Sequence, residues 1–287
     1  MLTLTRRLRS HISLVRTRRR LGDRRALADR FLAMETMPAL IPSPNGNFWF
    51  MTMPLPDGRR VVGVCPDVNR EQKLWTSCFG ADRDALVGQR VLDIGANDGF
   101  FSIAAALCGA KSVHSVNTGE LVHGTFPVNL RYAGGLWGVR PRVTVGDFQN
   151  LSTSGPKYDT ILFFGVFYHL ENVYSGLRVL ENILAPGGTI YLETQVTKVE
   201  SDLPVLEVAS DAYPTTVPQI HCTINSCGNS NYLLPNPAAV RALAETFGLR
   251  AAALPADNPY EADFGGPGRR RLFALTRPGD RPLPPRG

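Results

Sequence analysis

The sequence predicts an α/β protein built on a doubly wound, mostly parallel sheet. From residue 91 onward, short apolar runs alternate with helical patterns, which is the order of a parallel sheet whose strands are joined by helices. The first run, at 91–94, leads through a glycine-containing loop at 95–99 into a helical stretch at 100–108. Several of the runs also end at a glycine or a polar residue. Such a sheet binds its ligand beyond the carboxyl ends of its strands.

The expected sheet has seven strands, the last two forming an antiparallel pair: residues 91–94, 112–116, 142–145, 160–164, 189–192, 251–254 and 271–276. Further helices are expected at 173–184 and 237–247, where Gly248 stops the second. The stretch 195–235 is rich in Pro, Ser, Thr and Asn and is too long for an ordinary connection. We therefore expect it to cover a substrate site.

A small N-terminal cap is expected ahead of the sheet. It contains a helix at 26–34 and a hairpin at 47–64 that turns at Asp57-Gly58. Trp49 and Phe50 lie just before this turn, and they either cover a pocket or form the small core of the cap. The predicted domain plan has four parts: a basic segment at 1–30, the cap at 31–85, the sheet domain at 86–276 and a disordered tail at 277–287.

The positive charge of the chain is concentrated at its start. Residues 1–30 hold ten arginines and two aspartates, a net +8, whereas the whole chain is +6, which leaves −2 for the rest. Leu4, Leu8, Ile12 and Val15 have a helical spacing, which indicates an amphipathic helix. Four interpretations are open: a helix packed on the body with a solvated arginine face, a contact to RNA phosphates, a contact to an anionic membrane surface, and an organellar transit peptide.

Composition limits the class of protein. A chain of 287 residues with 44% hydrophobic residues buries one substantial core, or a core domain with a smaller appendage. No run of 18 apolar residues is present, so we expect no membrane insertion. The five cysteines are odd in number and lack CxxC or His/Cys ligand spacing. We therefore expect a reduced, cytoplasmic protein without a structural metal.

The loop at 95–99 carries the chemistry that can be read from sequence. Asp93-Ile94-Gly95-Ala96-Asn97-Asp98-Gly99 resembles motif I of the class I S-adenosylmethionine (SAM)-dependent methyltransferases. It is similar in particular to the subgroup related to the tRNA wobble-uridine (5-methoxy/5-oxyacetate) methyltransferases, whose loop reads DIGxNDGFFS. Further stretches fit the same subgroup: residues 49–63, 158–170, 184–194 and 231–248. The resemblance covers roughly residues 45–276 and implies a Rossmann-like fold with SAM as cofactor.

The resemblance also implies the cofactor-binding residues: Asp93, Gly95, Ala96, Asn97, Gly99, Phe100, Asn117, Asp147, Phe148, Phe164 and Gly165. The 95–99 loop would lie against the methionine part, and Asp93 would hold its amino group directly or through water. Asp147 would accept from the adenine amine, with Phe148 against the ring. Phe164 and Gly165 would offer backbone to the amino-acid end.

Asn117 departs from the family pattern. Most such enzymes carry an acid there that takes both ribose hydroxyls, whereas Asn offers one acceptor and an NH₂ group that needs another partner. The loss is ~1 kcal/mol of cofactor binding, the scale of one net hydrogen bond. Glu120 is a candidate substitute. A dinucleotide-binding site is the alternative for this loop. Such a site also requires an acidic residue at the end of the second strand, and the loop lacks the GxGxxG pattern.

His169 and Tyr168 are the catalytic candidates because they follow the fourth strand at the pocket mouth. His169 titrates near neutrality and is the base if the acceptor must lose a proton. The alternative is that His169 caps the next helix or bonds a carbonyl. Tyr168 is expected to contact substrate or cofactor. Weaker candidates are Glu171, Glu193 and His221, and His114, inside a strand, is expected to be structural.

The expected function is methyl transfer from SAM to an oxygen or nitrogen of a small-molecule acceptor, which we expect to be a secondary metabolite. One alternative is a tRNA wobble-uridine methyltransferase whose basic N-terminus grips phosphates. Another is a SAM-binding module without catalysis, given Asn117. Carboxymethyl transfer is disfavoured, because no Trp-Arg-Lys-Gly-Pro-Phe-like segment precedes the loop and only Tyr168 matches the residues expected to hold the extra carboxylate.

Overall fold

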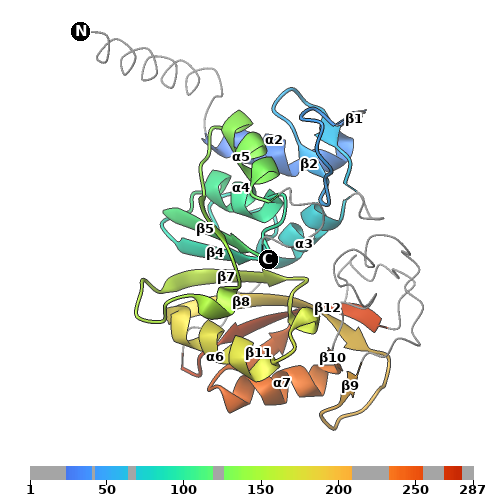
Figure 1. Ribbon diagram of the computed structural model, residues 1–287, viewed down its shortest axis with the longest axis vertical. Coiled ribbons are helices and arrows are strands. Elements are labelled where there is room, and N and C mark those ends of the chain that lie inside the picture. Colours follow the sequence, from blue (N-terminus) through green and yellow to red (C-terminus); the bar gives the residue numbers. More distant parts are fainter. Residues whose placement is uncertain are drawn as a thin grey trace.

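The computed structural model describes residues 24–40, 43–63, 69–118, 126–208, 233–254 and 268–279. Its centre is a seven-stranded sheet with the order β11-β12-β8-β7-β4-β5-β6 (Figure 1). The strands are β4 (Arg90–Ile94), β5 (Ser112–Asn117), β6 (Arg142–Val145), β7 (Tyr158–Phe164), β8 (Leu184–Thr197), β11 (Arg250–Ala253) and β12 (Gly268–Thr276). Strands β4 to β8 run parallel, whereas β12 is antiparallel to both β8 and β11. The predicted doubly wound sheet with an antiparallel last pair is confirmed.

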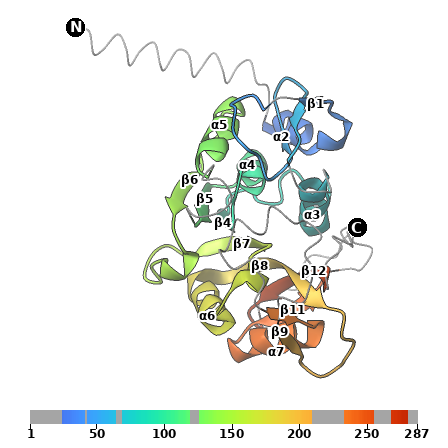
Figure 2. The same cartoon turned by 45° about the vertical axis from the view of Figure 1, so that its right-hand side comes forward.

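Helices cover both faces of this sheet (Figures 1 and 2). On one side lie α4 (Phe100–Leu107), α5 (Val128–Leu136) and the N-terminal cap, and on the other lie α6 (Val173–Ile183) and α7 (Pro237–Thr246). Alternate residues of the strands feed the two cores. Val91 packs with α4 and the cap, whereas Leu92 packs with α6. This alternation is what buries a parallel strand on both faces.

The N-terminal cap contains α2 (Arg24–Leu32), the 3₁₀ turn η1 (Met34–Thr36), β1 (Ala39–Leu40), β2 (Met53–Pro54), β3 (Arg60–Val61) and α3 (Arg70–Phe79). The predicted hairpin is present, since β2 and β3 pair antiparallel and Gly58 N–H donates to the Leu55 carbonyl. Trp49 is buried and belongs to the same hydrophobic cluster as α4. Its core interpretation is therefore the one the structure bears out, and the cap shares its core with the sheet domain.

The stretch predicted to be a cover begins as regular structure. β8 continues to Thr197, and β9 (Leu206–Val208) then pairs antiparallel with β10 (Leu233–Pro235). His114 is buried and bonded to Tyr158 Oη at 2.7 Å and to Thr144 Oγ1 at 2.8 Å, so its structural role is confirmed. The amphipathic segment up to residue 23, Glu120, His221 and the tail from residue 280 lie outside the described residues. Within the described part, no helix is long and apolar enough to cross a membrane.

Candidate active site

The carboxyl ends of four parallel strands meet at one edge of the sheet. β4 lies between β7 and β5, with Ile94 opposite both Phe163 and Val116, and β5 pairs with β6 through Asn117 and Val145. The loops after these strands therefore lie side by side, as the sequence predicts. They bring together the loop at 95–99, Asn117, Asp147 and Gly165.

The 95–99 loop is a tight left-handed turn. Gly95, Asn97 and Gly99 have φ values of 75°, 47° and 92°, and Asn is among the few side chains that adopt this region at low cost. The amides of Gly95 and Ala96 both donate to the Val116 carbonyl, at 2.9 and 3.2 Å. These two amides are thus not available to a ligand. Their N–H groups lie beside β5 and are already paired within the fold.

The two glycines of this loop make room for neighbouring side chains. A Cβ on Gly95 would lie 2.5 Å from Val166 Cγ2, and one on Gly99 would lie 2.1 Å from Leu130 Cδ1. Both contacts are far shorter than carbon atoms tolerate. In these two directions, the space beside the loop is therefore taken by the protein's own side chains.

Asp93 is a buried carboxylate at the end of β4. Its side chain accepts a hydrogen bond of 2.6 Å from Ser102 Oγ, and Ser102 contacts Ser115 Oγ at 2.6 Å. Burial raises the pKa of Asp93 to about 7, and the bond from Ser102 opposes that rise only in part. A carboxyl group with this pKa is ready to ionise when a cation arrives beside it.

Asn117 ends β5 with a hydrogen-bond donor that the fold does not use. The residue is 4% exposed, and its Nδ2 has no hydrogen-bond partner among the described residues. Its backbone carbonyl accepts from Gly146 N–H at 2.8 Å, which fixes the residue beside the loop after β6. An unused buried donor costs free energy, so this position favours a ligand that brings an acceptor.

The residues after β6 divide between surface and core. Asp147 is exposed, and its Oδ1 accepts from Gln149 N–H at 2.9 Å, capping the short turn η3 (Phe148–Asn150). Phe148 is buried and packs against Phe163 with ring centroids 5.3 Å apart. Its ring therefore belongs to the core beneath the site, and its role against adenine stays a prediction.

Phe100 and Phe164 are also core side chains. Phe100 lies against Phe31, with ring centroids 4.9 Å apart, and Phe164 lies against Phe101 at 4.8 Å. Both are almost fully buried. Only their main chains remain to serve a ligand, which is the part that the resemblance assigns to Phe164.

Tyr168 and His169 follow β7 in the short turn η4 (Phe167–His169). Tyr168 is buried, its ring lies 4.8 Å from the Arg270 guanidinium carbon, and burial raises the pKa of its hydroxyl. It is thus a hydrogen-bond donor at neutral pH and not a base. His169 is half-buried, and its ring centroid lies 4.2 Å from that of Tyr168. Its main-chain N–H donates to the Val166 carbonyl.

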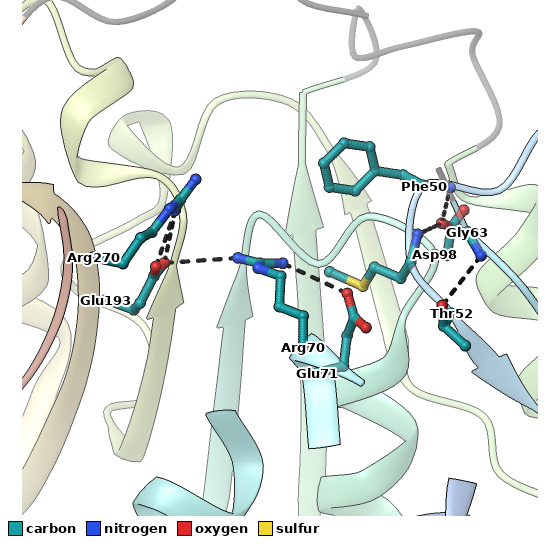
Figure 3. A network of polar contacts seen from close by, with 9 residues as sticks. Phe50, Thr52, Gly63, Arg70, Glu71, Asp98, Glu193 and Arg270 are labelled. Carbon is teal, nitrogen blue, oxygen red and sulfur yellow. Dashed lines mark hydrogen bonds and ion pairs between the residues drawn. The ribbon is translucent and has the colours of Figure 1, made fainter. Parts of the chain in front are cut away.

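A buried network of charges, which the sequence analysis missed, borders the same edge (Figure 3). Glu193 at the carboxyl edge of β8 accepts from Arg270 Nη1 at 3.0 Å and lies 3.7 Å from Arg70 Nη2. Arg70 is also 3.6 Å from Glu71, its neighbour on α3. Figure 3 shows these side chains converging from the cap, β8 and β12. No local pattern signals the pairing, because Arg70 and Arg270 stand 200 residues apart.

The strand order and the site together define a Rossmann-like methyltransferase of class I, the class that uses SAM. A family model described as "Methyltransferase domain" matches residues 38–229, which is 192 of the 287 residues. The chain therefore belongs to this methyltransferase family, and it is an enzyme of that class.

Curated relatives at modest identity carry one name, "tRNA U34 carboxymethyltransferase". The protein from Pseudomonas putida (strain W619) is 28% identical over 211 residues, covering 63% of this chain and 62% of the relative. Those from Pseudomonas aeruginosa (strain LESB58) and Pseudomonas fluorescens (strain SBW25) are both 32% identical, over 183 and 130 residues. The matches cover 62% and 45% of this chain, and 50% and 39% of those relatives. The chain thus spans about two fifths to three fifths of these relatives' length.

Solved structures share the fold at low identity. The N-terminal domain of EvdMO1, crystallised with S-adenosylhomocysteine (SAH), is 16% identical with a TM-score of 0.54, and the match covers 89% of this chain and 97% of that one. An O-methyltransferase family protein from Burkholderia thailandensis is 13% identical with a TM-score of 0.51, covering 73% and 56%. At these identities, the similarities show a shared fold alone.

The residues at the carboxyl edge fit SAM. Asp93 offers a carboxylate whose ionisation a cation would favour, and Asn117 offers an unused buried donor on the neighbouring strand. SAM carries an ammonium group at its methionine end and hydroxyl acceptors on its ribose. The two groups of the protein are complementary to those two features of the cofactor.

Proposed function

We propose that this protein transfers the methyl group of SAM to an oxygen or nitrogen atom of a small polar acceptor. The observation that carries the choice of acceptor is the balanced charge of the network beside Gly165, where Arg70 and Arg270 face Glu71 and Glu193. RNA binding depends on cationic side chains that remain available to phosphates. A buried, internally neutralised pocket wall suits a small molecule better.

In this proposal the cofactor lies across the ends of β4, β5 and β7. Asp93 holds the ammonium group directly or through water, and Asn117 donates to the ribose. The 95–99 loop bounds the methionine part, and the main chain of Phe164 and Gly165 contacts its amino-acid end. Asp147, exposed at the end of β6, takes the adenine amine. Support comes from the convergence of these residues at one edge of the sheet.

Methyl transfer needs the acceptor atom in line with the sulfonium methyl, and orientation supplies much of the rate. The acceptor side is bounded by Gly165, Tyr168 and Glu193, since a Cβ on Gly165 would lie 3.6 Å from Tyr168 Oη and 3.7 Å from Glu193 Oε2. Tyr168, which keeps its proton, orients the acceptor as a donor. His169 removes the acceptor's proton where the acceptor atom carries one.

The test is turnover of methyl-labelled SAM by the full-length chain with a metabolite extract, run beside total tRNA. We expect label in the small-molecule fraction and a loss of at least about a hundredfold in rate for His169→Ala, the lower end of the range for a general base. Label confined to tRNA would refute the small-molecule acceptor. A wild-type rate in the His169→Ala variant would show that His169 is not the base. SAH binding without turnover in either arm would instead support the non-catalytic module.

A tRNA wobble uridine is the second candidate acceptor, favoured by the names of the curated relatives and the ten arginines of residues 1–30. Arg24 and Arg25 pair with Asp84, so they are part of the folded cap. The seven arginines between residues 6 and 20 should therefore be replaced by glutamine in the full-length chain, leaving that pair intact. If this variant loses both tRNA binding and turnover, the result would support tRNA as the acceptor. Retained turnover on the small-molecule fraction would argue against it.

A further inference from the structure

Asp98 joins the 95–99 loop to the N-terminal cap (Figure 3). Its Oδ2 accepts from the main-chain N–H groups of Phe50 and Met51, at 2.6 and 2.7 Å, and its Oδ1 accepts from Asn129 Nδ2 at 2.9 Å. The residue is fully buried. A carboxylate with donors on both oxygens is held in one orientation, so the tip of the loop is fixed to a segment nearly fifty residues upstream.

The same contact is reinforced from α5. Asn129 is fully buried, and its Nδ2 also donates to the Phe48 carbonyl at 2.7 Å. Its Oδ1 accepts from Asn45 Nδ2 at 2.9 Å and from Asn47 Nδ2 at 3.1 Å. Asp98 and Asn129 therefore bind the segment 45–51 at several points. We call this set of hydrogen bonds the Asp98 clasp.

The clasp lies between two left-handed residues of the loop. Asp98 lies between Asn97 and Gly99, whose φ values of 47° and 92° are both in the left-handed region. Backbone geometry of this kind persists where the surroundings fix it. The Asp98 carboxylate and the packing of Leu130 against Gly99 are the two fixed points on either side.

The cap segment that the clasp holds is also fixed from its other side. Gly63 lies so close to this segment that a Cβ would be 2.3 Å from the Phe50 carbonyl oxygen, and its N–H donates to Thr52 Oγ1 at 3.2 Å. Figure 3 shows the Phe50 ring extending from the clasp on the side that faces Arg70. The cap main chain is thus held from both sides, and the partly buried Phe50 ring packs against the core that the cap shares with the sheet domain.

We propose that Asp98 is a positioning residue that makes the cofactor loop and the cap one unit. It holds the 95–99 loop in the geometry that receives the cofactor and places Phe50 as the cap-side wall of the acceptor pocket. Binding of the cofactor to the loop is thereby coupled to order in residues 48–51 of the cap. This inference rests on the proposed assignment of the loop to SAM.

The experiment measures SAH binding and amide hydrogen exchange on full-length Asp98→Asn. The amide NH₂ group would face main-chain N–H donors or Asn129 Nδ2, so either orientation sets two donors against each other. We expect SAH to bind at least about tenfold more weakly, the effect of one lost charge-assisted hydrogen bond. Amides of Phe50 and Met51 should lose protection, whereas those of β4 and β7 keep theirs. In wild type, SAH should increase protection at Phe50 and Met51.

The matched control is Asp57→Asn. Asp57 belongs to the same cap and its Oδ1 accepts from Arg59 N–H at 3.0 Å, but it is exposed and remote from the loop. It should change neither SAH affinity nor exchange at Phe50 and Met51. A second variant, Asn129→Ala, leaves both main-chain donors on Asp98 Oδ2 and removes the donor to Oδ1, together with the bonds that Asn129 makes to residues 45, 47 and 48. It should weaken SAH binding about threefold or more. It tests the inference if Asp98→Asn does not fold.

The outcomes separate this inference from the proposed cofactor site. Wild-type protein that does not bind SAH would overturn both. Wild-type binding with unchanged SAH affinity in Asp98→Asn, or in Asn129→Ala where the first variant does not fold, would overturn the positioning role alone. Lost protection in the cap with unchanged affinity would show a purely structural clasp.

Discussion

Binding of SAH at neutral pH should release protons from Asp93. In the ligand-free fold, burial raises the pKa of this carboxyl to about 7, because Ser102 is the only described side chain that donates to it. The ammonium group of the bound cofactor would favour the carboxylate and lower the pKa toward its ordinary value of about 3.9. The carboxyl, half-protonated at pH 7 before binding, would be ionised afterwards.

The magnitude follows from the two pKa values. About half a proton should be released per SAH bound at pH 7, and almost none at pH 9. SAH affinity should rise with pH up to about 7 and level off above it, because ionised Asp93 is the binding form. Isothermal titration in buffers with different ionisation enthalpies measures the release directly. Equal heats in all buffers at pH 7 would refute the role of Asp93.

The same group should make the ligand-free protein less stable as pH rises. Because its folded pKa lies above its unfolded one, Asp93 costs no stability below about pH 4, and the cost grows between there and its folded pKa of about 7. A shift from 3.8 to about 7 corresponds to a cost on the order of 4 kcal/mol above pH 7. Asp93→Asn should thus stabilise the apo protein at pH 8 and leave it unchanged at pH 4, while abolishing the proton release. Thermal unfolding at the two pH values checks this, and destabilisation at pH 8 would contradict it.

Three further substitutions test other parts of the site. Gly99→Ala should cost more than Gly46→Ala by at least ~2 kcal/mol in urea unfolding, because both have positive φ but only at Gly99 does a Cβ overlap another side chain. Asn117→Asp should tighten SAH binding by ~1 kcal/mol at pH 8, measured by titration, because the ribose hydroxyl that accepts from Asn117 can turn to donate, and a carboxylate accepts from both hydroxyls; weaker binding would contradict the ribose assignment. Arg270→Met should destabilise the fold by ~3 kcal/mol in urea unfolding by removing the partner of buried Glu193, and a neutral result would mean that Arg70 alone compensates that carboxylate.

The sheet could be predicted because its signals are local. Apolar runs, turn residues and helical periods located all seven strands, and the strand-end rule placed Asp93, Asn117 and Gly165 at one edge. β8 is the element whose length was underestimated, since it runs from Leu184 to Thr197 and not from 189 to 192. The Pro-Gly-Gly sequence at 186–188 keeps its irregular character inside β8, because Gly187 has a φ of 72° and the register with β7 shifts between Tyr158 and Thr160. The polar end of β8, up to Thr197, is a strand because β12 pairs with it.

The polar parts of the site could not be predicted in the same way. Asp98 looks like a spacer within the motif, because its partners Phe50 and Met51 donate through main-chain amides that leave no mark in the sequence. The charged network could not be predicted for the same reason, since Arg70 and Arg270 both pair with Glu193 but stand 200 residues apart. Side-chain pairing across such distances is decided by tertiary packing, which local patterns do not report.

The buried polar groups at the carboxyl edge of the sheet favour a charged, hydroxylated ligand. Asp93 is buried with a raised pKa, and Asn117 on the next strand holds a buried donor without a described partner. Each feature costs stability in the isolated fold, and a side chain of either kind is ordinarily satisfied by its neighbours. A ligand with a cation near β4 and an acceptor near β5 relieves both costs at once. Binding energy is then gained at two places where the fold alone leaves a buried polar group at a cost, which is the pattern expected of a site built for its cofactor.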